Sequence, residues 1–268
     1  MITALCGHWS IFQLVQGHRY TTDDLSCAAI AILEYTTKGL PSPKRHIDIG
    51  CGLGSVLLFV KWQFHDSLEM SIGIEAQEKH VELARKSVSV NMGNQDSNDT
   101  VISEVRHGDL RSLAEGNLQL LNEAEENSFD LITGTPPYFP VTEGVLPTVQ
   151  GRGMCSFELR GGVETYCLAA KRCLRKSKEA RFVFVQTAIE IKRSERAIWD
   201  LGEMEVLERV DFLGSESKKD PLFVIFVCGW GEKKEMYPTR TIAVRTSDGA
   251  YTRKYHDMLV LVGKPPLQ

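Results

Sequence analysis

HIDIGCGLGSVLLFV, residues 46–60, is the stretch that decides the fold of this chain. Its first part, His46–Ile49, is short and largely apolar, and we expect a buried strand there. Its middle part holds three glycines, Gly50, Gly52 and Gly54. Glycine lets a backbone turn with positive φ and pass close to a ligand. The apolar run from Ser55 predicts a helix, whose first N–H groups are free for polar ligand atoms. This order predicts a nucleotide-type cofactor pocket at the carboxyl edge of a parallel sheet.

The spacing of the glycines narrows the kind of cofactor. A dinucleotide site has G-x-G-x-x-G/A, whereas this turn has G-x-G-x-G, with Ser55 where the last small residue would stand. Asp48 precedes the first glycine by two residues, and an anionic side chain beside the ligand suits a cationic cofactor better than a pyrophosphate. A tight turn without any ligand is the alternative. Three glycines in five positions weaken local structure, which favours the ligand.

The composition of the chain limits the class of protein to which it can belong. The chain has 268 residues, of which 43% are hydrophobic and 25% charged, as in an ordinary globular protein. Its net charge of −4 excludes a polycation, so a contact with nucleic acid needs a local basic patch. The seven cysteines form no C-x-x-C pair, which predicts reduced thiols, a cytoplasmic location and no structural metal. No apolar run approaches the ~18 residues of a membrane span.

Residues 1–45 are predicted to form an N-terminal arm and a helix, ahead of one catalytic domain over 46–268. Thr22 and Asp23 stand just before the apolar run Leu25–Tyr35, as helix caps do. Capping alone would explain Asp23, and a place in the pocket is the other interpretation. The linker at 39–43 contains one glycine and two prolines and ends this helix.

Two acidic residues follow the next predicted strands. Glu75 ends the strand 69–75, 25 residues after Gly50, where a carboxylate can bind both hydroxyls of a ribose. Asp109 follows the strand Ile102–His107 and could accept a hydrogen bond from an adenine amine; a simple turn residue is the alternative. The acidic segment Leu113–Glu126 is predicted to be helical. The candidate pocket thus gains two carboxylates from neighbouring strands.

A second informative stretch follows the strand Phe129–Thr133. It reads GTPPYFP, and its residues Thr135, Pro136, Pro137 and Tyr138 form a proline-stiffened turn. Prolines cannot continue a strand ladder, and the residue before a proline is held extended. The turn therefore presents Tyr138 at the carboxyl edge of the sheet, where ligands of open α/β sheets bind. A purely structural turn is the alternative.

The second half of the chain supplies a candidate lid and a basic segment. The long stretch 141–162 is a candidate substrate lid. Helices are expected at 164–175 and 188–204, and strands at 181–187, 208–214, 222–229 and 240–245. Residues 152–196 hold 11 Lys or Arg and 5 Glu, which gives this segment +6 and leaves −10 for the rest. A nucleic-acid backbone would suit this charge, although solvated helix faces explain it equally.

Together Asp48-Ile-Gly-Cys-Gly-Leu-Gly54, Glu75, Asp109 and Thr135-Pro-Pro-Tyr138 resemble class I S-adenosylmethionine (SAM) methyltransferases of the branch whose fourth motif is [N/D/S]-P-P-[Y/F/W]. This branch methylates exocyclic or amide nitrogens. The segment from Gln16 to Asp23 and the C-terminal TIAVRTSDGAYTRKYHDML are similar to bacterial tRNA adenine-N6 methyltransferases. The resemblance implies a Rossmann-like, seven-stranded α/β sheet with helices on both faces.

The resemblance also implies the residue roles. SAM as cofactor would be bound by Thr22, Asp23, Asp48, Gly50, Gly52, Gly54, Glu75, Asp109 and Leu110. Thr135, Pro136, Pro137 and Tyr138 would hold the target amine and its base. The family has Asn where this chain has Thr135, and a hydroxyl is shorter than an amide and both donates and accepts. This departure bears on rate and substrate identity.

We therefore predict a SAM-dependent methyltransferase acting on an adenine amine in RNA, with tRNA as the first substrate class. A protein glutamine methyltransferase shares the P-P-Y turn, but a separate N-terminal helical domain is expected there, and only about 45 residues precede the first predicted strand here. A non-catalytic scaffold subunit with this fold is the third reading, and Thr135 is its main support. The acidic remainder leaves open an activating protein partner, and a monomer or weak dimer is expected.

Overall fold

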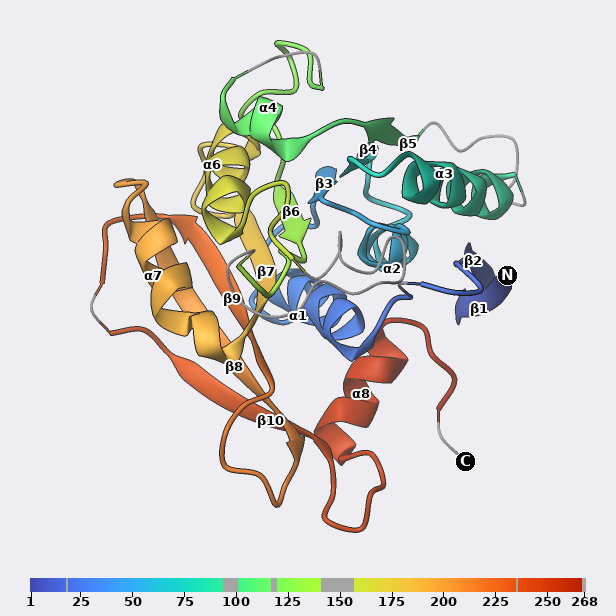
Figure 1. Ribbon diagram of the computed structural model, residues 1–268, viewed down its shortest axis with the longest axis vertical. Helices are drawn as coiled ribbons and strands as arrows, with labels where there is room; N and C mark the ends of the chain where they lie inside the picture. The colour runs from blue at the N-terminus through green and yellow to red at the C-terminus, as the bar shows by residue number, and fades with distance from the viewer. Residues whose placement is uncertain (18, 94–100, 117–119, 141–156, 235, 267–268) are drawn as a thin grey trace.

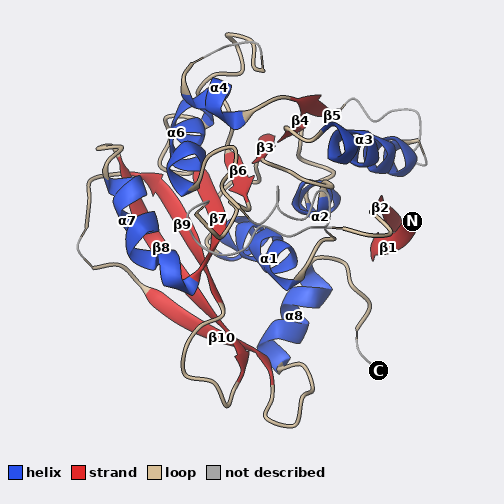
Figure 2. Ribbon diagram, in the orientation of Figure 1, coloured by secondary structure: helices blue, strands red, loops and turns tan. Residues whose placement is uncertain are grey.

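The computed structural model describes residues 1–17, 19–93, 101–116, 120–140, 157–234 and 236–266. A sheet of eight strands runs through the molecule, and helices cover both of its faces (Figure 1 and Figure 2). This arrangement confirms the α/β, Rossmann-like fold expected from the sequence. Most of the candidate lid at 141–162 lies outside the described residues.

The order of the strands places the glycine turn near the middle of the sheet. The strands are β3 (Arg45–Ile49), β4 (Met70–Glu75), β5 (Ile102–His107), β6 (Leu131–Gly134), β7 (Arg181–Thr187), β8 (Met204–Ser215), β9 (Phe223–Trp230) and β10 (Thr239–Arg245). Their spatial order is β10-β8-β9-β7-β6-β3-β4-β5. The strands from β5 to β7 are parallel, and β9 runs antiparallel between β7 and β8. The chain order reverses at β3, between β4 and β6, which is where ligands of such sheets bind.

Each face of the sheet has its own core. One face is covered by α1 (Thr22–Thr37), α2 (Ser55–Gln63), α3 (Glu78–Met92) and α8 (Arg253–Leu261). The other is covered by α4 (Leu110–Ala114), α6 (Val163–Cys173) and α7 (Ile191–Trp199), which follows the short 3₁₀ turn η1 (Ala188–Glu190). In β7 the alternation is plain, because Val183 packs on the first face while Phe182 and Phe184 pack on the second.

The N-terminal arm is a β-hairpin rather than an irregular segment. β1 (Ile2–Cys6) and β2 (Trp9–Phe12) pair with each other and form a separate two-stranded sheet. The hairpin is fixed to α3, because the backbone N–H of Phe12 donates to the Ser87 hydroxyl at 2.9 Å. The apolar alternation of this short segment, with Trp9 and Ile11 fully buried, is the signal for strands that the prediction of an arm missed.

The sheet has one strand more than the seven that the resemblance implies. The eighth, β10, was expected as a strand from its sequence, and it adds to the outer edge as a parallel partner of β8. Ile242 and Val244 of β10 are buried in the same core as α8. The extra strand extends the sheet at the end far from β3, so it leaves the surroundings of the glycine turn unchanged.

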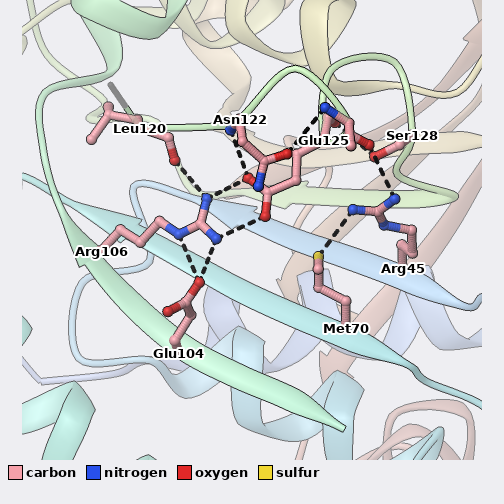
Figure 3. A network of polar contacts seen from close by, with 9 residues as sticks. Arg45, Met70, Glu104, Arg106, Leu120, Asn122, Glu125 and Ser128 are labelled. Atoms are coloured by element: carbon pink, nitrogen blue, oxygen red, sulfur yellow. Dashed lines mark hydrogen bonds and ion pairs between the residues drawn. The ribbon is translucent and has the colours of Figure 1, made fainter. Parts of the chain in front are cut away.

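The helix predicted over Leu113–Glu126 is wrong. Only α4 forms, and after the gap at 117–119 the described residues 120–127 form bends and turns. Glu125 explains the difference, since its carboxylate lies buried and accepts hydrogen bonds from both terminal nitrogens of Arg106, at 2.6 and 2.9 Å (Figure 3). An acidic side chain that looks like a solvated helix face in the sequence is instead one half of an ion pair with β5.

Candidate functional site

A cavity of about 660 Å³ opens at the carboxyl edge of the parallel strands. Residues that follow β3, β4, β5 and β6 line it, together with residues from two further parts of the chain, 15–17 with 19–24, and 157–166. Ten of the residues that the sequence predicts for the site line it: Asp23, Gly50, Gly52, Glu75, Asp109, Leu110, Thr135, Pro136, Pro137 and Tyr138. The fold therefore gathers the glycine turn and the T-P-P-Y turn, more than 80 residues apart in the chain, around one space.

The glycine turn meets the cavity with one crowded position, Gly50, and one open position, Gly52. Gly50 has φ of +69°, and a Cβ atom built there would lie 2.0 Å from the hydroxyl oxygen of Tyr166. Gly52 has φ of +54°, but nothing lies within 4 Å of a Cβ built on it. Cys51, between them, is buried, and burial raises the pKa of its thiol well above the usual range. The turn therefore offers its bare backbone to whatever occupies the cavity.

Glu75 connects the glycine turn to the end of β4. One of its carboxylate oxygens accepts from the N–H of Gly52 at 3.0 Å, and the other accepts from the N–H of Gln77 at 2.6 Å. Burial raises the pKa of this carboxyl, and the two backbone donors oppose that shift. Each carboxylate oxygen has a second lone pair, so Glu75 can still accept hydrogen bonds from two neighbouring hydroxyls of a ligand.

Asp109 caps α4 at the adjacent strand end. Its carboxylate accepts from the backbone N–H of Arg111 at 2.9 Å and pairs with the Arg111 guanidinium at 2.7 Å. Burial alone would raise the pKa of Asp109, but the hydrogen bonds and charge of Arg111 outweigh it and hold the pKa below its usual value. The group is thus an anion on the cavity wall, already engaged on one side.

Three predicted cofactor residues lie off the wall. Thr22 is the exposed first residue of α1, and Gly54, with φ of +83°, caps α2 from behind the turn. Asp48 lies beneath the turn, 1% exposed, where it accepts from the Thr133 hydroxyl at 2.7 Å and from the N–H of Leu57 at 3.2 Å. Asp48 therefore fixes α2 against β6 from below, and a direct contact between it and a ligand stays a prediction.

A buried histidine completes the support under the turn. His46 Nε2 lies 2.9 Å from the Thr133 hydroxyl, and Nδ1 lies 3.3 Å from the Ser71 hydroxyl. Burial lowers the pKa of His46 to about 3, so the ring is neutral. Because the Thr133 hydroxyl donates to Asp48, it accepts from His46 Nε2–H, which leaves Nδ1 to accept from Ser71. Burial raises the pKa of Asp48 to about 7, although both hydrogen bonds to it act in the opposite direction.

The T-P-P-Y turn is tied to the start of α1. The Tyr138 hydroxyl donates to one carboxylate oxygen of Asp23, and the Thr21 hydroxyl donates to the other. Burial raises the pKa of Tyr138 well above its usual range, and the Asp23 charge adds to this shift, so Tyr138 keeps its proton. Gln186 of β7 also donates to the backbone oxygen of Pro137 at 3.5 Å. Asp23 thus holds the aromatic residue of the turn, a role that the sequence did not indicate.

Several wall residues were not foreseen. They are Arg19, Gln77, Phe139, Phe157, Arg160 and Tyr166. Arg160 acts on both acidic strand ends, because its charge opposes the rise that burial causes in the pKa of Glu75 and adds to the lowering of the pKa of Asp109 by Arg111. Neither Arg160 nor Tyr166 belongs to a spaced motif, and the only sequence signal for Arg160 is its place in the basic segment 152–196. Their position on the wall follows from the path of residues 157–166 over the glycine turn.

The described wall is richer in acid than in base. Four carboxyl groups line it, from Asp23, Asp24, Glu75 and Asp109, against the two guanidinium groups of Arg19 and Arg160. Asp24 has the largest shift among these acids, since burial and the neighbouring Asp23 raise its pKa well above the usual range and favour its neutral form, whereas burial raises the pKa of Glu75 less. Three acidic groups remain to make the cavity more favourable to a cationic ligand than to an anionic one.

Solved structures share this architecture. A predicted O-methyltransferase from Agrobacterium tumefaciens superposes with a TM-score of 0.62 at 14% identity, over 91% of this chain and 98% of its own. The chain has the fold of class I SAM-dependent methyltransferases. A type I restriction-modification methyltransferase subunit from Streptococcus thermophilus is similar too, with a TM-score of 0.56 at 13% identity. This match covers 91% of the chain but only 53% of the subunit, so the chain spans about half the length of that protein.

No protein-family model and no curated protein sequence matches the chain. The structural likeness therefore shows the methyltransferase fold alone. Within the described residues no helix is long and apolar enough to cross a membrane, and no group of three His, Cys, Asp or Glu side chains could hold a metal ion. The six cysteines that the structure describes as free are all buried.

Proposed function

We propose that this protein is a SAM-dependent N-methyltransferase that acts on the exocyclic amine of an adenine in RNA, with tRNA as the first class to test. The observation that carries the proposal is that the glycine turn with Glu75 and the turn Thr135–Tyr138 line a single cavity. One set of residues suits an adenosine-bearing cofactor, and the other suits a flat base with an amine. An N-methyl transfer needs both within reach of each other.

The residues present fit SAM. The cofactor would lie over the open side of Gly52, where a Cβ meets nothing within 4 Å. Glu75 would accept from the ribose hydroxyls with its free lone pairs, and Asp109 would accept from the adenine amine. The acid-rich wall matches the net positive charge of a sulfonium cofactor. When bound, SAM supplies an electrophilic methyl group on its sulfur.

Catalysis by this chain would be positioning. The Thr135 hydroxyl and the Pro136 carbonyl would accept hydrogen bonds from the target amine and direct its lone pair toward the methyl carbon. Tyr138, whose hydroxyl Asp23 holds, would stack on the base. These residues would supply position rather than a base, because the proton of the amine can leave to water after the transfer.

A scaffold subunit is the second candidate, and Thr135 favours it. The resembled family has an amide at this place, and a hydroxyl forms fewer hydrogen bonds to an amine. Replacing Thr135 by Asn separates the two readings. A gain of about tenfold or more in transfer would fit an enzyme whose amine site was retuned. No transfer in either form, with the SAM product still bound, would favour the scaffold.

The test of the proposal is methyl transfer from labelled SAM. Bulk tRNA, an adenine-bearing DNA oligonucleotide and a release-factor-like protein are offered in parallel, and Tyr138→Ala is the control. We expect label on tRNA with the wild type, little with the variant, and S-adenosylhomocysteine bound by both. Label on the protein substrate alone would replace the proposal by a glutamine methyltransferase. If the wild type does not bind S-adenosylhomocysteine, SAM is not its cofactor and the proposal fails.

A further inference from the structure

One aromatic side chain of the cavity wall faces solvent. Phe139 follows Tyr138 directly, lines the cavity and is 43% exposed. The other aromatic residues of the described wall are more enclosed, since Tyr166 is 7% and Phe157 6% exposed. A side chain that lines the cavity and still faces water lies at its mouth. A part of a ligand that extends out of the cavity would pass this ring.

The ring of Phe139 has a firm support. The ring centroid of Phe157 lies 5.7 Å away with the planes tilted by 43°, and the two residues form a parallel β-bridge. The N–H of Glu158 donates to the backbone oxygen of Phe139 at 3.0 Å. These contacts fix Phe139 from behind and leave its outer side uncovered, as a stacking surface requires.

An ion-pair cluster holds the supporting segment in turn. Arg193 of α7 donates to both carboxylate oxygens of Glu158, at 2.8 and 2.9 Å, and to both of Glu164, at 2.6 and 2.7 Å. Glu158 follows Phe157, and Glu164 lies in the first turn of α6. Two bidentate pairs on one guanidinium restrict the segment that backs Phe139 to one position. The exposed ring is therefore part of a fixed surface.

Positive charge also lines the cavity. Arg19 is exposed and lines the cavity, and it donates to the backbone oxygen of Val15 at 2.8 Å and of Leu14 at 3.3 Å. A guanidinium has five N–H donors, so others remain for a ligand. The combination of an exposed aromatic face and a cation is how proteins bind single-stranded nucleic acid, because a base stacks and a phosphate is neutralised.

We propose that Phe139 is the stacking platform for the nucleotide next to the target base, with Arg19 neutralising the phosphate that joins the two. This subsite rests on the proposed function and narrows it to adenines within single-stranded or loop nucleic acid. The target base enters the cavity beside Tyr138, and its neighbour remains at the mouth on Phe139. A free nucleoside lacks this second contact.

The experiment measures how kcat/KM rises with substrate length. The probes are adenosine monophosphate and trinucleotides with a central adenine, as RNA and as DNA, for the wild type, Phe139→Leu and Phe139→Trp. Leu keeps an apolar cover over Phe157 but lacks the aromatic face, and Trp keeps the face. Met236→Ala is the surface control, since Met236 is an apolar residue that is 88% exposed and does not line the cavity.

For the wild type we expect the trinucleotide to exceed the mononucleotide by about tenfold in kcat/KM, the size of one stacking contact. Phe139→Leu should lose most of this gain, Phe139→Trp should retain it, and Met236→Ala should match the wild type. Binding of S-adenosylhomocysteine by each variant reports that the fold is intact. A gain that is equal in wild type and Phe139→Leu would overturn the subsite while leaving the methyltransferase proposal standing.

The remaining outcomes distinguish RNA from DNA as the ligand, and the failure of the subsite from the failure of the proposed function. A length gain with RNA but not with DNA assigns the subsite to RNA, and the reverse assigns it to DNA. If no adenine substrate of any length accepts a methyl group from the wild type, the proposed function fails and the subsite fails with it. Arg19→Ala supplies an independent arm, since it should weaken the trinucleotide's advantage most at low salt.

Discussion

The two ends of the cavity are held by different kinds of contact. At the glycine turn, the hydrogen bonds of Glu75 join residues close in sequence: Glu75 accepts from the backbone of Gln77, two residues on, and of Gly52, 23 residues back. At the T-P-P-Y turn they join distant ones, since Tyr138 donates to Asp23, 115 residues away, and Gln186 to Pro137 across 49. The contacts of Glu75 lie within one βαβ unit, whereas those of Tyr138 and Pro137 form only when α1, β6 and β7 are assembled.

The cofactor half and the substrate half of the cavity should therefore be sensitive to different substitutions. A change in the glycine turn should remove the cofactor without disturbing the contacts of Tyr138. A change at Asp23 or Tyr138 should disturb the substrate half while the cofactor half stays formed. Measurements that report on each half separately, cofactor affinity on one side and substrate kinetics on the other, therefore test the division.

The largest effect is expected from Gly50→Ala. The backbone of the new alanine would have to keep φ of +69°, and its Cβ atom would lie 2.0 Å from the hydroxyl oxygen of Tyr166. Left-handed strain of about 1–2 kcal/mol and overpacking of about 1–3 kcal/mol should add, and S-adenosylhomocysteine binding should be lost. Calorimetric titration and thermal unfolding measure both effects.

Gly39→Ala is the matched control for this variant. Gly39 has φ of +68°, nearly that of Gly50, but nothing lies within 4 Å of a Cβ built there. It should show the strain alone and keep full affinity for the ligand. Equal effects of the two substitutions would mean that the packing of Tyr166 against the turn contributes nothing to the site.

A pH-dependent effect of intermediate size is expected at Asp48. Burial raises its pKa from 3.8 to about 7, so the folded state holds the proton more tightly than the unfolded state does. The stability that this supplies is complete below about pH 4 and is lost as the pH rises through 7, with a slope of up to about 1.4 kcal/mol per pH unit. In Asp48→Asn this contribution to the slope should vanish. Urea unfolding between pH 4 and 8 measures it.

The difference between wild type and variant is what matters in that experiment, because Asp24 and Glu75 also have raised pKa values and titrate in both proteins. Identical slopes would show that the pKa of Asp48 is not raised in the folded protein. A parallel shift of both curves would report only the loss of its hydrogen bonds to Thr133 and Leu57.

The smallest effect is expected from Tyr138→Phe. The ring that would stack on the base remains, and only the hydrogen bond to Asp23 is lost, which is worth about 1.5–3 kcal/mol when one partner is charged. We expect KM for the nucleic-acid substrate to rise several-fold and the affinity for S-adenosylhomocysteine to stay within twofold. Asp23→Asn, which keeps an acceptor, should lie between Tyr138→Phe and the wild type. A loss of cofactor affinity in Tyr138→Phe would break the division between the two halves.

The same division explains what the sequence could predict. The strand, turn and helix around Gly50, and the places of Glu75 and Asp109, follow from local pattern and spacing, and the structure brings them together. Asp48 was expected beside the ligand, but spacing alone does not reveal whether a strand residue points above or below the turn. The hydroxyl of Thr133, on a strand far along the chain, donates to Asp48 and holds this carboxyl beneath the glycine turn.

The unforeseen residues depend on long-range packing. Tyr166 reaches Gly50 because α6 covers one face of the sheet, and Phe139 is held at the cavity mouth because it packs against Phe157. The prediction of a helix over Leu113–Glu126 was wrong for the same reason, since Glu125 is buried in an ion pair with Arg106. In each case the partner lies in another element, so no window of local sequence contains the information.

Cys51 gives the glycine turn a built-in chemical reporter. Its sulfur is enclosed between Gly50 and Gly52, with the backbone of Gly73 close behind, since a Cβ at Gly73 would lie 2.7 Å from it. A buried, protonated thiol does not react with alkylating reagents, so modification of Cys51 requires the turn to open. The alkylation rate of Cys51 therefore measures how often the glycine turn opens. A ligand that holds the turn closed lowers this rate according to the fraction of protein that has the ligand bound.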